Sequence, residues 1–407
     1  MTGTAPVKYL YRISDKRRGD MEGLPLLSVS VHRGVIPRTE LTDAEPRADD
    51  LSNYKLVDAG DIVINRMSAY QGALGIAHER GIASPEYIVL QPNDDVDPRY
   101  LTYLFKSTWF VSQMTSRLRG IGGTEQGNVR TPRINPEDLG GIAVPLPAYG
   151  HQTTVADYLD VETARIDALI DKKQRMVELL LEADKAKLDL WVADLFSNWG
   201  ATSLRRRLKR IEQGWSPQCD AVEADPSEWG VLKTSAVSSG CFLPSENKRL
   251  PEDIKPDLRW ELHDGDLLVI RGSGSASKVG VASVVRTRGR RLMMSDLIYR
   301  LILSGMNSEF VAAVMQSRIV RGELESQIRN DVGQTLKVRV DDLKNLSMPA
   351  TPLAEQEEAL NVLKSRKAGV TEMVIVLQRQ IELLAEHRQA LITAAVTGQL
   401  EIPEVAA

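Results

Sequence analysis

Cysteine is nearly absent from this 407-residue sequence, and its scarcity excludes whole classes of protein. Only Cys219 and Cys241 occur, which is too few for a disulfide framework or for a paired-cysteine zinc site. Long apolar runs are also missing. None is long enough to cross a bilayer, and residues 1–11 lack the apolar core of a signal peptide. We therefore expect a cytoplasmic protein, in a reducing compartment, with no membrane partner.

Catalytic signatures are missing as well. The sequence has no Gly-x-x-x-x-Gly-Lys phosphate loop, no His-Glu-x-x-His zinc motif and no Pro-Pro-Tyr segment of the type that amino-methyltransferases use. Its five histidines are scattered along the chain. The Gly-rich segment 271–275 is more typical of a flexible loop after a strand than of a nucleotide site. We expect no catalytic residue, no metal site and no cofactor in this chain.

The sequence contains a long internal repeat. Gly60-Asp61, followed by an apolar run and Arg66, reappears 205 residues later as Gly265-Asp266, an apolar run and Arg271. Further landmarks recur at an offset of 204 residues: Asp138 and Asp342, Pro145 and Pro349, Gln152 and Gln356. The repeat predicts a tandem duplication, in which a globular unit is followed each time by a long helix.

The pattern divides the chain into four segments: 1–150, 151–200, 201–352 and 353–407. The first and third are of mixed α/β (α+β) type, with short β-like runs between Gly, Asp and Pro turns. The expected strands are 26–30, 62–64, 87–90, 229–232, 267–270, 281–285 and 297–301, and a helix is expected after Pro98. The second and fourth segments are long helices, which we expect to end at 197–200 and at Gly398 and Pro403.

Each helical segment carries an apolar seam, with residues recurring at alternating steps of three and four. The predicted seam residues are Ile166, Leu169, Met176, Leu180, Val370, Val374, Leu377, Ile381, Leu384 and Leu391. Two such helices in one chain can pair as an antiparallel coiled coil about a pseudo-two-fold axis. About 45 helical residues would hold two globular units roughly 65 Å apart. The alternative is that each helix packs only onto its own globular unit.

Charge is distributed unevenly, although the net charge is only −4. Residues 1–150 have a net charge of −1 and residues 201–352 of +4, whereas the two helical segments together carry −7. The relatively basic globular units therefore suit DNA better than the helices do. Arg and Lys can bind phosphate and guanine, and Gln can read adenine. The candidate DNA-binding residues are Arg66, Tyr70, Gln71, Lys106, Arg117, Arg119, Arg130, Arg133, Arg271, Ser273, Ser275, Lys278, Arg286, Arg288, Arg290, Arg291, Arg329 and Lys337.

Two interpretations stay open for these cations. Any single arginine can instead be a solvated surface charge. The Arg286–Arg291 cluster is the strongest individual candidate, and its alternative is a basic hairpin turn without a DNA contact.

The ordered motifs resemble those of one protein family. The Gly-Asp strands ending at Arg66 and Arg271 are followed by a Gly-rich segment at 122–128, with its counterpart at 332–337. Pro-rich junctions at 144–152 and 348–356 then lead to Gln152 and Gln356. Together these features resemble the specificity subunit of type I restriction-modification systems over almost the whole chain. The sequence has His151 where the family usually has Glu, a change that a helix-capping role tolerates.

The resemblance implies a fold and a set of partners. It implies two target recognition domains, each reading one half of a bipartite double-stranded DNA site, separated by an antiparallel coiled coil of the two helices. The helices would set the gap and dock two modification (methyltransferase) subunits, and restriction subunits with ATP-dependent translocase and nuclease activity would join. S-adenosylmethionine, ATP and Mg²⁺ would then belong to the partners. Because segment 67–71 differs from 272–276, we expect an asymmetric target, with half-sites roughly one DNA turn apart.

Other functions remain open at this point. One is a stand-alone DNA-binding or scaffold protein with a duplicated domain. Another is a similar subunit of a different phage-defence or methylation-only system. An independent nuclease or methyltransferase has the least support, because no catalytic motif is present.

Overall fold

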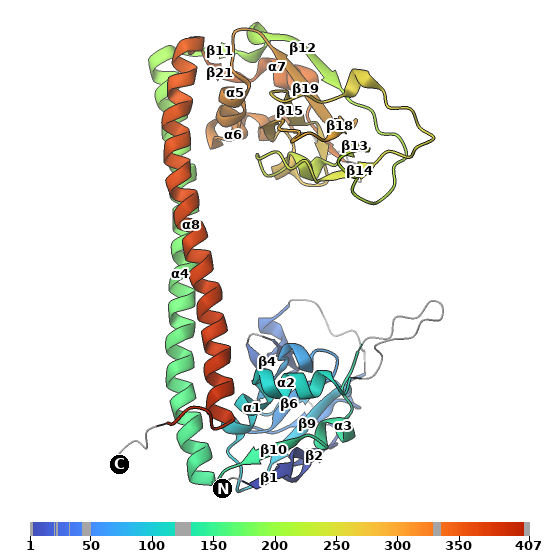
Figure 1. Ribbon diagram of the computed structural model, residues 1–407, viewed down its shortest axis with the longest axis vertical. Coiled ribbons are helices and arrows are strands. Elements are labelled where there is room, and N and C mark those ends of the chain that lie inside the picture. Colours follow the sequence, from blue (N-terminus) through green and yellow to red (C-terminus); the bar gives the residue numbers. More distant parts are fainter. Residues whose placement is uncertain are drawn as a thin grey trace. The chain divides into compact units, whose positions relative to one another are not determined.

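The computed structural model describes residues 3–19, 21, 23–31, 33–42, 50–118, 132–328 and 335–402. The chain forms two compact units (Figure 1). Unit 1 combines Met1–Arg175 with Leu377–Ala407, and unit 2 is Met176–Val376. Each unit therefore contains one globular part and about half of each long helix, α4 (Tyr149–Trp199) and α8 (Leu353–Val396). No helix among the described residues is both long and apolar enough to span a membrane.

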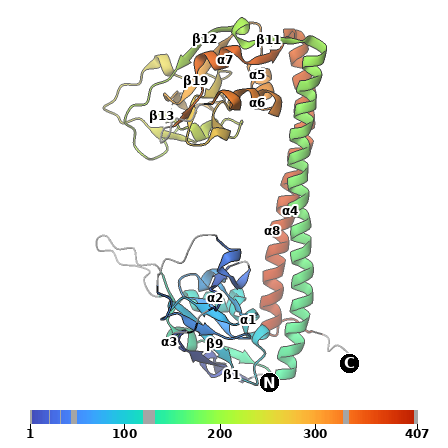
Figure 2. The ribbon, with the colours of Figure 1, turned by 180° about the vertical axis from the view of Figure 1, so that it is seen from behind.

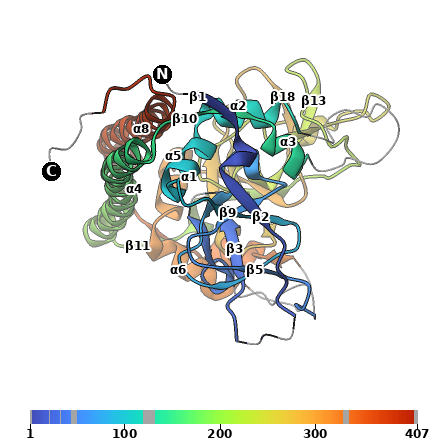
Figure 3. The same cartoon turned by 90° about the horizontal axis from the view of Figure 1, so that it is seen from below.

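Unit 1 is built around an antiparallel sheet in the order β2-β9-β6-β7. Figure 3 labels two of these strands, β2 and β9. These strands are β2 (Tyr11–Ser14), β9 (Tyr87–Pro92), β6 (Ile62–Asn65) and β7 (Leu74–Ile76). Three strand pairs surround it: β1 (Gly3–Pro6) with β10 (Ala143–Leu146), β3 (Leu27–Ser30) with β4 (Gly34–Pro37), and β5 (Lys55–Val57) with β8 (Gly81–Ala83). The short helices are η1 (Val7–Tyr9), η2 (Arg38–Glu40), η3 (Ala69–Gln71), α1 (Pro98–Lys106), α2 (Thr108–Thr115) and α3 (Pro136–Gly140).

Unit 2 repeats this plan, with a central sheet in the order β12-β19-β15-β17. Figure 2 labels two of these strands, β12 and β19. These strands are β12 (Leu208–Gln213), β19 (Ile298–Leu303), β15 (Leu267–Ile270) and β17 (Ala282–Val284). The others are β11 (Ala201–Ser203) with β21 (Ser347–Pro349), β16 (Gly272–Ser273) with β20 (Leu336–Lys337), and β14 (Asn247–Arg249) with β13 (Trp229–Leu232) and β18 (Arg291–Met293). The short helices are η4 (Leu204–Arg207), η5 (Thr234–Ala236), η6 (Leu258–Trp260), η7 (Ala276–Lys278), α5 (Ser308–Met315), α6 (Arg318–Gln327) and α7 (Val340–Asn345).

The predicted mixed fold, its internal repeat and its two long helices are confirmed. All seven expected strands are present within one or two residues of their predicted bounds, and α1 begins at Pro98 as expected. The long helices differ slightly from expectation at their ends. α4 continues through 197–199 and stops at Gly200, whose φ is +68° and whose N–H bonds to the Phe196 carbonyl at 2.8 Å. α8 ends just before Gly398, whose φ is +73°.

The Gly-Asp repeat is a structural turn. Gly60 and Gly265 have φ of +93° and +94°, a backbone conformation that favours glycine. The carboxylate of the following aspartate accepts the backbone N–H three residues earlier: Asp61 from Asp58 at 2.9 Å, and Asp266 from His263 at 3.0 Å. The motif therefore starts β6 and β15 in the same way, which explains why both copies retain it.

The two turn aspartates differ in what surrounds them. In unit 2 the buried Arg300 donates to Asp266 at 3.1 Å and to Glu212 at 2.7 Å. In unit 1 Val89 pairs opposite Val63 at the corresponding position of β9, and burial raises the pKa of Asp61. One aspartate is thus compensated by a buried cation and the other is not.

We expect isosteric amides at these two positions to act in opposite directions. The raised pKa means that charged Asp61 opposes folding, so stability falls as pH rises through that pKa. The Asp61→Asn variant does not suffer this loss of stability. The difference between its free energy of unfolding and that of wild type should therefore increase from mildly acidic to neutral pH. Asp266→Asn instead removes an ionic partner of buried Arg300, with a loss of about 1–2 kcal/mol. Urea unfolding across a pH series measures both, and changes of the same sign would contradict this account.

Both cores are completed by one end of each long helix. The unit 1 core includes Val155, Ala156 and Leu159 from the start of α4 and Ile392, Ala395 and Val396 from the end of α8. The unit 2 core includes Leu360 and Leu363 from the start of α8 and Leu188, Trp191, Val192 and Leu195 from the end of α4. Most of these residues are related by the 204-residue offset, so the repeat extends to core packing.

The helices run antiparallel, as predicted. Within unit 1, Lys173 donates to Gln380 at 2.7 Å and Arg388 to Asp167 at 2.8 Å, so residue numbers rise along α4 as they fall along α8. The hypothesis that each helix packs only onto its own globular part is therefore wrong.

The predicted seam of α4 needs correction at two positions. Leu169 and Met176 are 41% and 51% exposed, whereas the neighbouring Ile170 and Val177 are half-buried. Ile166, Leu180 and all six predicted residues of α8 are less exposed, as expected of a seam. The error arose because a seam can alternate in steps of three then four, or of four then three. The two orders share every second position and differ by one residue at the positions between. Subtracting 204 from the α8 residues Val374 and Ile381 gives positions 170 and 177, so the repeat itself held the correct assignment.

Candidate functional site

A buried glutamine fixes each globular part to a long helix. Gln152 and Gln356 lie in the first turns of α4 and α8 and are 1% and 0% exposed. Their Oε1 atoms accept the backbone N–H groups of Asp97 at 3.0 Å and Asn307 at 2.8 Å, the N-caps of α1 and α5. Their Nε2 atoms donate to carbonyls just before their own helices, Pro147 at 3.0 Å and Thr351 at 2.8 Å. An amide is needed here because the side chain both donates and accepts.

A second contact at each helix start has opposite charge in the two units. Arg99 donates to Asp157 at 2.7 Å and to Asp160 at 2.9 Å on α4. At the corresponding place in unit 2, Glu309 pairs with Lys364 of α8 at 2.5 Å. The charges of each contact are therefore complementary within a unit, and they are reversed between the two units.

The repeated arginines are held by internal partners. Arg66 donates to the Ile134 carbonyl at 3.1 Å and to Asn135 Oδ1 at 2.7 Å. Arg271 donates to the Tyr299 hydroxyl at 3.2 Å. The backbone carbonyl of each arginine also accepts an equivalent N–H, from Ile134 at 3.2 Å and from Val338 at 2.9 Å. These arginines anchor the chain that follows the segments 119–131 and 329–334, and a DNA contact by either stays a prediction.

Three candidates of unit 1 line a groove beside the long helices. Tyr70, Gln71 and Lys106 face α4 and α8 residues that include Asp167 and Arg388, and the groove volume is about 860 Å³. Burial, and then the neighbouring Arg388, lowers the pKa of Lys106. The groove has acidic as well as basic walls, so its charge does not single out a polyanion.

The remaining candidates of unit 1 are dispersed. Arg117 donates to the Gln113 carbonyl one turn earlier on α2, at 2.6 Å. Arg133 is exposed. Arg119 and Arg130 lie outside the described residues, as does Arg329 of unit 2.

Unit 2 gathers a group of hydroxyls and cations after β15. Ser273 and Ser275 are half-buried, Lys278 is exposed, and β16 pairs Gly272 with the exposed Lys337. Arg321 supports this loop by donating to the carbonyls of Val279 at 2.6 Å and Ser277 at 3.1 Å. The loop thus presents side chains that can bind phosphate or base edges on a well-anchored backbone.

The Arg286–Arg291 cluster separates into two kinds of arginine. Arg286 pairs with Glu309, and Arg290 donates to the Ala224 carbonyl at 2.9 Å and pairs with Glu223 at 2.8 Å. The side chains of Arg288 and Arg291 are exposed, and neither side chain has an ion pair or hydrogen bond to another described residue. The cluster connects β17 to β18, which lie in different sheets, so it is not a hairpin turn. Arg288 and Arg291 are its two members whose exposed side chains have no described partner, and a DNA contact by them stays a prediction.

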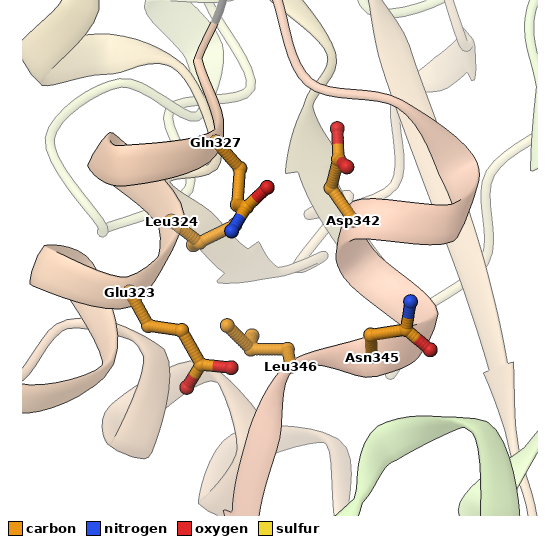
Figure 4. Close-up of a pocket in the computed structure, with 6 residues that line it drawn as sticks. All are labelled: Glu323, Leu324, Gln327, Asp342, Asn345 and Leu346. Atoms are coloured by element: carbon orange, nitrogen blue, oxygen red, sulfur yellow. The ribbon is translucent and has the colours of Figure 1, made fainter.

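A small pocket in unit 2 offers no comparable site. Figure 4 shows it between α6 and α7, with a volume of about 90 Å³. Its carboxylates already have partners: Glu323 accepts the Ser347 N–H at 3.1 Å, and Asp342 the Arg339 N–H at 2.9 Å. Within the ranges that the structure describes, no cluster of His, Cys, Asp or Glu could hold a metal ion.

Comparison with known proteins gives a consistent result. No protein-family model matches the chain. It is 30% identical over 170 residues to the type I restriction enzyme EcoEI specificity subunit of Escherichia coli, covering 41% of this chain and 28% of that protein. It is 22% identical over 360 residues to the StySPI specificity subunit of Salmonella potsdam, covering 84% of this chain and 74% of that protein. In sequence, the chain is similar to type I specificity subunits.

A solved structure supports the fold of the chain. That structure concerns complex assembly and conformational transition of a type I restriction-modification system. The two chains superpose with a TM-score of 0.66 at 15% identity, over 98% of each. The similarity extends along both globular parts and both helices, as the sequence resemblance predicted.

The sequence did not predict the contacts that hold each globular part to a long helix. Gln152 and Gln356 stand out in the sequence as repeat landmarks, but the sequence does not indicate their bonds to the N-caps of α1 and α5. Arg99 and Glu309 were missed because their charges are opposite, so a search for identical residues passes over them.

We expect the exposed and the anchored arginines of the β17–β18 turn to behave differently. Arg288→Gln with Arg291→Gln should weaken DNA binding by about tenfold and leave stability within about 0.5 kcal/mol. Arg290→Gln should lower stability by about 1 kcal/mol, because it releases the Ala224 carbonyl and Glu223. Filter binding and urea unfolding of all variants separate these effects, and unchanged DNA affinity in the double variant would remove this turn from the DNA surface.

Proposed function

We propose that this chain is the DNA-specificity subunit of a type I restriction-modification complex and is itself non-catalytic. Each globular part would read one half of a bipartite, asymmetric DNA site. The observation that carries the proposal is the duplicated architecture of the two units. The two units share strand order, turns and helix contacts, whereas the side chains that follow β6 and β15 differ.

The repeat also supports two copies of one partner. Exposed apolar side chains recur on the long helices at the 204-residue offset: Leu169 with Met373, and Leu179 with Leu383. Apolar groups exposed at repeated positions favour protein contact. Two equivalent surfaces favour two copies of the same protein, and two modification subunits fit this requirement. The acidic net charge of the helices disfavours DNA at these surfaces.

The partners would supply the chemistry. S-adenosylmethionine would be bound by the modification subunits, and ATP and Mg²⁺ by restriction subunits. This chain would contribute recognition alone, through hydrogen-bonding and basic side chains at the strand ends.

The methylated sequence tests the proposal directly. Expression with its modification subunits should methylate a non-palindromic motif made of two short half-sites separated by a fixed gap of unspecified bases. Sequencing of modified bases in the host DNA gives this motif. A continuous or palindromic motif would count against the proposal, and so would methyl transfer by the purified chain alone.

A further inference from the structure

The positive surplus of unit 2 is concentrated in one short segment. Residues 201–352 contain 23 Lys and Arg against 19 Asp and Glu. Residues 204–210, here called the basic segment, hold five of these cations: Arg205, Arg206, Arg207, Lys209 and Arg210. Without them the balance is 18 against 19, a net charge of −1, which equals that of residues 1–150. The five cations of the basic segment thus equal in number the difference in net charge between the two globular parts.

Four cations of the basic segment are exposed and weakly neutralised, and the fifth, Arg207, is half-buried. Arg206 and Lys209 are exposed, and neither forms an ion pair or side-chain hydrogen bond with another described residue. Arg205 donates to the neutral Asn345 Oδ1 at 3.2 Å. Arg210 pairs with Glu212 at 2.6 Å, but that carboxylate also binds Arg300. The segment thus presents a net positive surface to solvent.

The basic segment lies at the opposite end of the central sheet from the loop after β15. β12 is an edge strand, and its first residue Leu208 pairs with Leu303, the last residue of β19. Ile270, where β15 ends, pairs with Ile298, the first residue of β19. The six residues of β19 separate the two places by about 17 Å along the strand. The basic segment is therefore a surface distinct from the candidate reading loop.

We propose that the basic segment binds the phosphate backbone of double-stranded DNA independently of sequence. Its exposed side chains are cationic, whereas Leu204 is buried and Leu208 packs against the unit 2 core. A protein-binding surface needs a desolvated core of aromatic or aliphatic groups, which this face lacks. Phosphate neutralisation needs only correctly spaced cations. The corresponding stretch of unit 1 exposes only two cations, Lys8 and Arg12, beside the apolar Tyr9 and Ile13, so the denser positive surface belongs to unit 2.

Two variants with the same charge change test the proposal on the full chain. Arg206→Gln with Lys209→Gln removes two exposed cations of the basic segment without touching a described side-chain contact. Lys248→Gln with Lys255→Gln is the matched control, because both lysines are exposed on the same unit and outside the segment. Fluorescence anisotropy with a duplex of scrambled sequence, over a salt series, reports non-specific affinity. Circular dichroism confirms that both variants are folded.

The first variant should lose about tenfold in affinity at moderate salt, and its slope of log affinity against log salt should decrease by about 2. The control should stay near wild type. Equal weakening of both variants would overturn the proposal, since it would show a net-charge effect alone. Unchanged binding would also overturn it, as would a preference for an acidic polypeptide over DNA. The methylated motif should be unaltered in the first variant, so failure of this proposal is distinguishable from failure of the proposed function.

Discussion

Placing aspartate at Leu377 and Leu384 should abolish the folded pairing of α8. Leu377 is only 7% exposed and Leu384 is half-buried, so Leu377→Asp with Leu384→Asp removes apolar burial and puts unpaired carboxylates into the seam. We expect a loss of about 5 kcal/mol, a large part of the stability of an ordinary domain. Circular dichroism should show reduced helix content at a temperature where wild type is folded.

The matched control uses exposed positions of the same helix. Met373 and Leu383 are 51% and 46% exposed, so Met373→Asp with Leu383→Asp should change stability by less than about 1 kcal/mol. Under the proposed function, this control should still weaken co-purification with modification subunits. If the seam variant is as stable as the control, α8 does not pack through Leu377 and Leu384.

Gln356→Leu should produce the second large effect, a loss of about 2–4 kcal/mol centred on unit 2. Leucine fills a similar volume but leaves the buried Asn307 N–H and the Thr351 carbonyl without their present partners. The bond that attaches the start of α8 to α5 is then lost. Hydrogen exchange should show faster exchange of the backbone amides at the starts of α5 and α8. Urea unfolding should show the lower stability.

Gln378→Leu is the control for this substitution. Gln378 lies on the same helix and is exposed, so its replacement should change stability by less than about 0.5 kcal/mol. Equal effects of the two substitutions would mean that Gln356 does not attach the helix to the globular part.

The repeat and the short strands could be predicted because their causes are local. Gly60 and Gly265 are required by positive φ, and apolar runs such as 267–270 form buried strands wherever turns bound them. The family resemblance followed from the same landmarks. The seam of α4 was harder to predict, because the sequence of a single helix does not show which of two adjacent apolar residues faces the partner helix. Leu169 and Ile170 are both apolar, and only packing separates them.

By itself, the sequence determined the duplication, the element types and the uneven charge, since each depends on residues close together in the chain or on composition. Only the tertiary structure decided which polar side chains are free. Arg66, Arg271 and Arg290 cannot be told from Arg288 and Arg291 by sequence, because their partners lie tens of residues away. Hydrogen-bond partners and burial are properties of distant segments brought together, and they separate anchoring arginines from those exposed to a ligand.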